Sequence, residues 1–236
     1  MTIADKVNVL WDGESMLAVE KSAGLSTQAP PGAESLESRL RTQLSDRSDY
    51  LAVVHRLDRP VSGVVLVALR KRVAHLLSQQ FATRKVEKQY LAVVSGEIEP
   101  GEQRWTDYLR KVPDHAHAER VAEDHPDAKY AETRVQLVRY NAAQDRSLVR
   151  LFPSTGRMHQ LRVQSALRGH PILGDSRYGR VHGQGGESDV IPSSQGLSAP
   201  QQTRIMLHAE SITFHHPKSG VRVTVQCPAD ELQQIV

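Results

Sequence analysis

The sequence of 236 residues is poor in cysteine and in long apolar runs, and each shortage excludes a class of protein. Cys227 is the only cysteine, which excludes an intramolecular disulfide and a zinc site built from several thiolates. No apolar run approaches the ~18 residues that a membrane-spanning helix needs. Because the first residues also lack the charged and then apolar layout of a signal peptide, we expect a cytoplasmic protein without a membrane partner.

Signatures of bound cofactors are missing as well. No strand pattern is followed by a GxGxxG fingerprint and no phosphate-binding P-loop occurs, so nucleotide cofactors have no support. His115, His117 and His125 stand in the polar stretch 100–127, where a metal site is one interpretation. No pair of them lies on an evident helix face, and we expect this stretch to be a solvated excursion. The sequence therefore predicts neither a metal nor a cofactor.

The composition is that of an ordinary globular protein with a mild excess of positive charge. A hydrophobic content of 39% supports a sizeable core, and a charged content of 24% is typical. The formal net charge is +3 and the isoelectric point is 9.1, which is compatible with a nucleic-acid partner. The length allows one large domain or two small ones.

Strand and helix patterns follow one another without a regular alternation. The Asp12-Gly13 pair predicts a hairpin near the start of the chain. Helices are expected at 33–44, 71–83 and 154–169, the last one capped by Ser154 or Thr155 and ended by Gly169. Further strands are expected at 51–58, 64–69, 87–98, 129–140, 147–152, 204–214 and 221–227. This mixture favours an α+β fold, in which helices and loops flank a mostly antiparallel or mixed central sheet. Residues 178–202 are rich in Gly, Ser, Pro and Gln and are expected to form a mobile surface loop.

The stretch 55–68, HRLDRPVSGVVLVA, is the most informative part of the chain. Asp58 stands between Arg56 and Arg59 in a polar turn that leads directly into an apolar, β-branched strand. Positive neighbours favour the ionised form of a carboxylate, and Pro60 with the following Gly stiffens its mount. The stretch is therefore compatible with a reactive acid. Taken alone, it is more typical of a turn aspartate that pairs with a local arginine, and the rest of the chain has to favour the reactive acid.

Two further polar residues stand where apolar patterns would not require them. Tyr90 follows Lys88 and precedes four apolar residues, so it is either a core aromatic or a functional one. Arg162 in GRMHQLRVQ is three residues from His159, which places the two on one helical face, opposite much of the apolar side. A helical arginine is usually solvated. An ionised acid in a cleft, however, needs such a partner to stay charged.

Four motifs in order resemble a known family. They are HRLDRPVSG, the K-x-Y-x-A-x-V-x-G pattern of 88–96, GRMHQLRVQ with the following GHPILGD, and MLHA followed by HP. Together they resemble the pseudouridine synthases of the RluA type, which act on large-subunit rRNA and tRNA. The resemblance spans essentially the whole chain. It implies one pseudouridine synthase catalytic domain over 1–236 with a central cleft, and a monomer. Many relatives carry an added N-terminal RNA-binding module, but we expect none here because the predicted hairpin begins almost at Met1.

The resemblance also implies roles for particular residues. Asp58 matches the family's catalytic aspartate. Tyr90 matches the aromatic residue that stacks on the target uracil and is a candidate for removing the proton from its carbon 5. Arg162 matches the basic residue that pairs with the carboxylate, and Arg56 the arginine that takes the place of the displaced nucleotide. Lys88 and His159 are expected to contact the RNA as well.

The chemistry of uridine isomerisation suits these residue types. The glycosidic bond breaks, the uracil turns, and its carbon 5 joins the ribose, with no redox change. A carboxylate can attack the sugar as a nucleophile or abstract a ribose proton as a base, and the sequence leaves both routes open. A stacked uridine is out of reach, so the target base is expected to flip out of the RNA. Without an added module, a compact tRNA stem-loop or an exposed rRNA hairpin is the expected substrate.

Two positions depart from the family pattern, and two other functions remain open. Val61 stands where the family usually has Thr, and Gln164 where it often has His, which concerns loop rigidity and substrate preference. One alternative is a catalytically silent protein of the same fold that binds or remodels RNA. The other is a nucleosidase or glycoside hydrolase, which typically pairs two carboxylates, here Asp58 and Asp175.

Overall fold

A computed structural model describes residues 6–179 and 204–236 of the chain. The described residues belong to two compact units. The first unit takes its residues from Met1–Tyr90 and His208–Asp230, and the second from Leu91–Leu207 and Glu231–Val236. No helix within the described ranges is long and apolar enough to cross a membrane.

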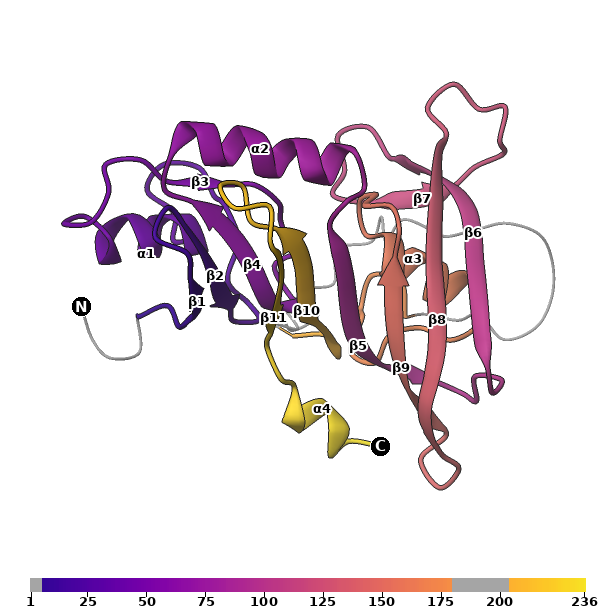
Figure 1. The fold of residues 1–236 in the computed structure, drawn as a ribbon. Helices are drawn as coiled ribbons and strands as arrows, with labels where there is room; N and C mark the ends of the chain where they lie inside the picture. Colours follow the sequence, from indigo (N-terminus) through magenta and orange to yellow (C-terminus); the bar gives the residue numbers. More distant parts are fainter. Residues whose placement is uncertain (1–5, 180–203) are drawn as a thin grey trace. The chain divides into compact units, whose positions relative to one another are not determined.

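The first unit contains a mixed sheet built on the N-terminal hairpin (Figure 1). Strands β1 and β2 pair antiparallel across the Asp12-Gly13 turn, which confirms the predicted hairpin. The order continues from β2 to β4 and β10, with β3 on β4 and β11 on β10. The pairing of β4 with β10 is parallel, whereas the other pairs are antiparallel. The strands span Val9–Asp12 (β1), Met16–Lys21 (β2), Ala52–Val53 (β3), Ser62–Ala68 (β4), Leu207–His215 (β10) and Arg222–Gln226 (β11).

Strand β4 is the centre of this sheet and is buried along its whole length. Its apolar residues face neighbours on both sides, as the run of β-branched residues predicts. Gly63 lies so close to β10 that a Cβ atom there would meet the carbonyl oxygen of Ala209 at 2.4 Å. With a φ of +121° at Gly63, only glycine fits the join between the Asp58 loop and β4.

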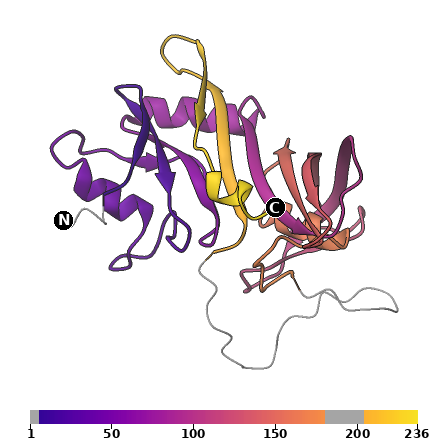
Figure 2. The ribbon, with the colours of Figure 1, turned by 90° about the horizontal axis from the view of Figure 1, so that it is seen from below.

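Two helices of the first unit match their predicted positions. Helix α1 (Leu36–Gln43) begins at Ser35, whose side chain accepts from the backbone N–H of Ser38 in a capping box. Helix α2 (Lys71–Ala82) packs against β3 and β4 (Figure 1). Its Leu77 is buried, whereas the side chains of its polar face are exposed, so its amphipathic pattern is confirmed. Strands β10 and β11 run as a long hairpin (Figure 2).

The second unit contains an antiparallel sheet in the order β9-β8-β6-β7. Strand β5 (Glu87–Ser95) begins in the first unit and ends in the second. The other strands span Glu102–Lys111 (β6), Ala118–Arg120 (β7), Lys129–Asn141 (β8) and Arg146–Pro153 (β9). The meander of β8 and β9 agrees with the predicted strands at 129–140 and 147–152.

The expectation of a solvated excursion over 100–127 is wrong, because β6 and β7 lie within it. Strand β6 buries Trp105, Asp107 and Leu109 on one face and exposes polar residues on the other. Because one face of β6 is exposed to solvent and the other contains an aspartate, β6 has fewer apolar residues than β4. Its sequence therefore resembles that of a polar loop. Pro113 lies between the two strands, where it interrupts no ladder.

The predicted helix 154–169 is shorter than expected. Helix α3 (Gln160–Leu167) begins after His159, which adopts a left-handed conformation with a φ of 51°. The hydroxyl of Thr155 donates to the side-chain oxygen of Gln160, instead of capping a helix that starts beside it. Gly169 ends the helix with a φ of +78°, as predicted. The chain closes with α4 (Asp230–Gln233).

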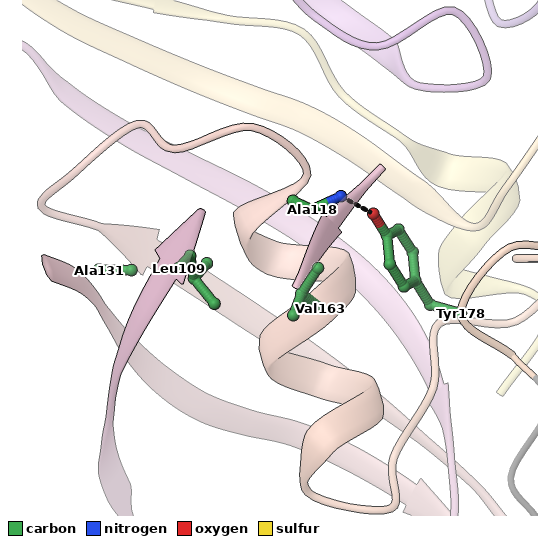
Figure 3. Close-up of a cluster of buried hydrophobic side chains, with 5 residues drawn as sticks. All are labelled: Leu109, Ala118, Ala131, Val163 and Tyr178. Atoms are coloured by element: carbon green, nitrogen blue, oxygen red, sulfur yellow. Dashed lines mark hydrogen bonds between the residues drawn. The ribbon is translucent and has the colours of Figure 1, made fainter. Parts of the chain in front are cut away.

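Helix α3 packs against β6 and β7 around a cluster of buried residues, Leu109, Ala118, Ala131, Val163 and Tyr178 (Figure 3). Tyr178 is therefore a core residue, and not the start of a surface loop. Of the predicted loop 178–202, the structure describes only Tyr178 and Gly179. The remaining residues of this loop lie outside the described residues.

Candidate active site

The Asp58 loop of the first unit is held by neutral hydrogen bonds on both sides of the carboxylate. Buried Thr27 donates its hydroxyl to the carbonyl of Leu57 at 2.8 Å and accepts from the N–H of the same residue at 3.2 Å. The N–H of Val61 donates to the carbonyl of Asp58 at 3.0 Å and closes the turn. The backbone at Asp58 is thus fixed by its immediate neighbours, which suits a side chain that must be aimed.

Lys21 lies beside this loop, and sequence reasoning missed it. Its side chain is 0% exposed, at the end of the apolar strand β2. The ammonium donates to the carbonyls of Ser22 at 2.9 Å, Leu25 at 2.8 Å and Arg59 at 3.3 Å. Burial lowers the pKa of Lys21 to about 8, while the negative charge of Asp58 opposes that fall. The sequence signal for Lys21 is that a lysine ends an apolar strand.

The two arginines that flank Asp58 differ in what they do. Arg59 donates its Nε–H to the carbonyl of Gly24 at 2.9 Å, and the N–H of Gly24 returns a bond of 2.8 Å to the carbonyl of Arg59. Arg59 therefore ties the loop 22–25 to the Asp58 loop. Arg56 is exposed, so its side chain is accessible to a nucleic acid.

Tyr90 lies within electrostatic reach of Asp58. Its side chain is half-buried, and the loss of solvation together with the negative charge of Asp58 raises the pKa of Tyr90. The phenol is therefore protonated at neutral pH, which suits a stacking surface better than a ready base. Tyr90, Lys88 and His55 line one small pocket of the first unit.

Burial in this pocket affects both Lys88 and His55. Burial lowers the pKa of Lys88 to about 8, and that of His55 to about 3 with help from the charge of Lys88. The neutral imidazole of His55 accepts the N–H of Leu66 in β4 at 2.9 Å. His55 thus attaches the start of the Asp58 loop to the central strand, which is a structural use of the first residue of the HRLD motif.

A buried serine–histidine pair supports the opposite end of the motif. The Nε2 of His208 lies 2.8 Å from the carbonyl oxygen of Cys227, and a nitrogen that contacts a carbonyl must carry the proton. The Nδ1 of His208 then accepts from the hydroxyl of Ser62 at 2.8 Å. The MLHA and VSG motifs are therefore joined inside the sheet, next to the glycine that β10 touches.

Arg162 belongs to the second unit, where it is buried and not on the polar face of its helix as predicted. Its Nε donates to Oδ2 of Asp175 at 2.6 Å, and its Nη2 donates to Oδ1 at 2.8 Å. The pairing of Arg162 with Asp58 stays a prediction. His159 contacts the hydroxyl of Tyr178 through Nδ1 at 2.7 Å.

Both departures from the family pattern occupy buried positions. Val61 is 3% exposed, so a branched apolar side chain fits where the family usually has Thr. Gln164 is 0% exposed and accepts from Thr133 at 2.7 Å. Its Nε2 donates to the carbonyl of Trp105 at 3.1 Å and to Asp107 at 2.8 Å. Gln164 therefore fastens α3 to β6 and β8.

His117 and His125 have different partners. His117 stacks on Tyr178 with ring centroids 4.9 Å apart. His125 contacts Arg110 at 2.8 Å and accepts from the N–H of Asp127. In the part of the chain that the structure describes, no group of three or more His, Cys, Asp or Glu is arranged to hold a metal.

Comparison with known proteins supports what the motifs predict. The model of the family described as RNA pseudouridylate synthase matches residues 15–167. The tRNA pseudouridine synthase C of Haemophilus ducreyi is 33% identical over 246 residues, which cover 98% of this chain and 94% of that protein. The dual-specificity RNA pseudouridine synthase RluA of Escherichia coli is 34% identical, with 94% of this chain and 93% of that protein covered. The chain belongs to the RNA pseudouridylate synthase family.

The fold agrees with this membership. Human RNA pseudouridylate synthase domain containing 1 superposes with a TM-score of 0.75 over 100% of this chain and 89% of that one, at 24% identity. The α+β class with a mixed sheet is confirmed. This pseudouridine synthase is of the RluA type, an isomerase that modifies RNA. Asp58, Tyr90 and Arg162 lie inside the segment that the family model matches, whereas Asp175 and Tyr178 lie beyond it.

Proposed function

We propose that this pseudouridine synthase converts specific uridines of tRNA or large-subunit rRNA into pseudouridine, with Asp58 as its catalytic carboxylate. One relative is named for tRNA and another for dual specificity, which supports structured RNA as the substrate class. The observation that carries the proposal is electrostatic. The charge of Asp58 acts on both Tyr90 and Lys21, which supports a site that combines a carboxylate, an aromatic ring and a buried cation.

The reaction needs a reactive group at the ribose and a surface for the detached base. The bond from N1 of uracil to C1′ breaks, a new bond from C5 to C1′ forms, C5 loses a proton and N1 gains one. Asp58 either attacks the sugar as a nucleophile or removes a ribose proton as a base. The half-buried ring of Tyr90 supplies a flat surface on which the base turns, because stacking tolerates rotation about the ring normal.

Arg162 is proposed to complete the site. Its ion pair with Asp175 uses the Nε and Nη2 edge of the guanidinium. We propose that Arg162 also pairs with Asp58, which the match of both residues to the family's motifs supports, and that residues 1–236 form a single catalytic domain. Arg56, exposed beside Asp58, is proposed to fill the place of the flipped nucleotide, with Lys88 and His159 as further RNA contacts.

The hydrolase alternative is weakened by the surroundings of Asp175. A glycoside hydrolase typically needs a second carboxylate that is free to act as an acid, a base or a nucleophile. The side chain of Asp175 is 0% exposed, and both of its oxygens accept from Arg162. Asp175 is therefore committed to Arg162 and is not free to serve as the second carboxylate of a hydrolase.

The test is to map pseudouridines in RNA from cells that lack the gene, after complementation with the wild-type enzyme or with Asp58→Asn. We expect the wild-type enzyme to restore pseudouridine at a defined site in tRNA or rRNA. Asp58→Asn should restore none, although it still binds RNA. Asp46→Asn, which changes an exposed carboxylate on the same unit, is the matched control and should behave as wild type.

Three outcomes would contradict the proposal. Full modification by Asp58→Asn would remove the carboxylate from the chemistry. Normal cell function with Asp58→Asn, and no site lost on deletion, would support the silent RNA-binding protein. Release of free uracil from RNA would support a hydrolase.

A further inference from the structure

The turn that follows α3 grips the guanidinium of Arg162 through one carboxylate. The side chain of Asp175 is 0% exposed and faces the Nε and Nη2 edge of Arg162 at 2.6 and 2.8 Å. Its Oδ1 also accepts from the backbone N–H groups of Arg177 at 3.0 Å and Tyr178 at 3.2 Å. A single buried carboxylate therefore fixes both the plane of the guanidinium and the backbone of the turn.

Tyr178 extends this grip to the sheet. Its ring centroid lies 5.1 Å from the guanidinium carbon of Arg162, so the aromatic face covers the cation. Its hydroxyl accepts from the N–H of Ala118 in β7 at 2.9 Å and contacts Nδ1 of His159 at 2.7 Å. Figure 3 shows the phenol directed at β7, beside Val163 of α3. One side chain thus joins the turn, the sheet and the residue that precedes α3.

The turn itself is closed too tightly to adjust. The N–H of Gly179 donates to the carbonyl of Asp175 at 2.7 Å, and a Cβ atom at Gly179 would meet the same oxygen at 2.2 Å. The aliphatic part of an arginine side chain has several rotatable bonds, and a misplacement of ~1 Å in a catalytic arrangement can cost about a hundredfold in rate. The contacts of this turn hold the guanidinium from its Nε and Nη2 edge and from one face.

We infer that Asp175 and Tyr178 are positioning residues for the isomerisation, which act on the reaction through Arg162. The inference rests on the proposed function, in which Arg162 pairs with Asp58. Asp175 fixes the direction of the guanidinium in its plane, and Tyr178 fixes its height above the turn. Neither residue touches the uridine.

The test is a double-mutant cycle on the single-turnover rate, with bulk tRNA and rRNA from cells that lack the gene as substrate. Asp175→Asn should lower the rate at saturating enzyme about a hundredfold. The enzyme concentration at half-maximal rate should change less than threefold, because RNA binding is left intact. Arg162→Met should have a similar effect. The double variant should be no slower than Arg162→Met alone, because Asp175 acts through Arg162.

A purely structural role for Asp175 gives a different pattern. The two losses would then multiply to about ten-thousandfold, which would overturn the inference, as would a wild-type rate for Asp175→Asn. Asp107→Asn is the matched control, because it breaks another ion pair of the same unit, to Arg168 at 2.9 Å. Its effect on the rate should be small and should multiply with that of Arg162→Met.

A second variant keeps the test decisive if Asp175→Asn does not fold. Tyr178→Phe keeps the ring over the guanidinium and removes the hydroxyl, so we expect a loss of about tenfold in rate at unchanged half-saturation. A wild-type rate for Tyr178→Phe would overturn the role of this residue. Asp58→Asn separates the two proposals. If it is active, the proposed function fails; if it is inactive while Asp175→Asn keeps full rate, only the present inference fails.

Discussion

Each of the two units buries a cationic side chain, and the two side chains donate to different kinds of acceptor. Lys21 of the first unit donates to three neutral carbonyl oxygens, and burial lowers its pKa to about 8. Arg162 of the second unit donates to the carboxylate of Asp175. The first unit therefore provides a positive charge that is held by neutral carbonyls, acts on Asp58 and depends on pH. The second provides an ion pair whose cation stays charged at any pH at which the protein is folded.

The largest effect is expected from Lys21→Met. This change removes the charge that acts on Asp58 and leaves the carbonyls of Ser22 and Leu25 without their donor. Each unsatisfied buried group costs about 1–3 kcal/mol, so the Asp58 loop should loosen. We expect pseudouridine formation to slow about a hundredfold, measured as the single-turnover rate on RNA from cells that lack the gene.

Lys71→Met is the control for that variant, because Lys71 is exposed on α2. Its rate should equal that of the wild type. A Lys21→Met enzyme as fast as wild type would mean that the first unit does not use its buried charge, and the contrast between the two cations would then concern stability alone.

The pH dependence of stability gives the next largest effect. The pKa of Lys21 falls from 10.5 to about 8 on folding, so between these values the unfolded chain binds more protons than the folded one. The free energy of unfolding then rises with pH across this window, by about 3 kcal/mol from this lysine alone. Burial raises the pKa of Cys227 to about 12, which acts in the opposite direction above pH 9.

Comparison of variants isolates the lysine. Urea unfolding of wild type and Lys21→Met at pH 7 and pH 10 should show a difference that grows in favour of the wild type at the higher pH. The contribution of Cys227 cancels in that difference, since both chains contain it. A difference independent of pH would show that Lys21 is not protonated against a burial penalty.

Thr27→Val tests the neutral clamp on the Asp58 loop. Valine keeps the branched shape and removes the hydroxyl that bonds both backbone groups of Leu57. We expect a loss of about 1 kcal/mol in the free energy of unfolding. The single-turnover rate should fall about tenfold, since Leu57 directly precedes Asp58. Thr42→Val, at an exposed hydroxyl on α1, should leave both quantities unchanged.

The sequence predicts well those elements whose signals are local. The Asp12-Gly13 turn, the apolar run of β4 and the Gly169 end of α3 each depend on signals within a few residues, and all three are found where expected. Strand β6 was missed, because its buried Asp107 is explained only by Gln164 and Arg168, which lie 57 and 61 residues further along the chain. A pattern within one strand cannot show a partner that another element supplies.

The candidate site divides in the same way. Motifs single out Asp58, Tyr90 and Arg162 in the sequence, but the residues that surround them depend on the fold. Lys21 reaches the Asp58 loop only because β2 pairs with β4, with Lys21 opposite Gly63. The start of α3 was misplaced because the left-handed conformation of His159 has no local signal in a non-glycine residue.

The smallest effect is expected from Glu87→Gln, and it tests whether burial or geometry sets the value of an ion pair. Arg222 contacts both oxygens of Glu87 at 2.8 Å, a distance like that between Arg162 and Asp175. The exposed fractions differ: 60% and 67% for Arg222 and Glu87, against 7% and 0% for the buried pair. Water screens the exposed pair, so its loss should change the free energy of unfolding by less than about 0.5 kcal/mol. Loss of the buried carboxylate should cost about 3 kcal/mol, because an arginine stays behind without its counter-charge.

Urea unfolding of both variants at low and high salt measures the contrast. Equal losses would mean that hydrogen-bond geometry alone sets the strength of these pairs, and the special position of Arg162 would lose its physical basis.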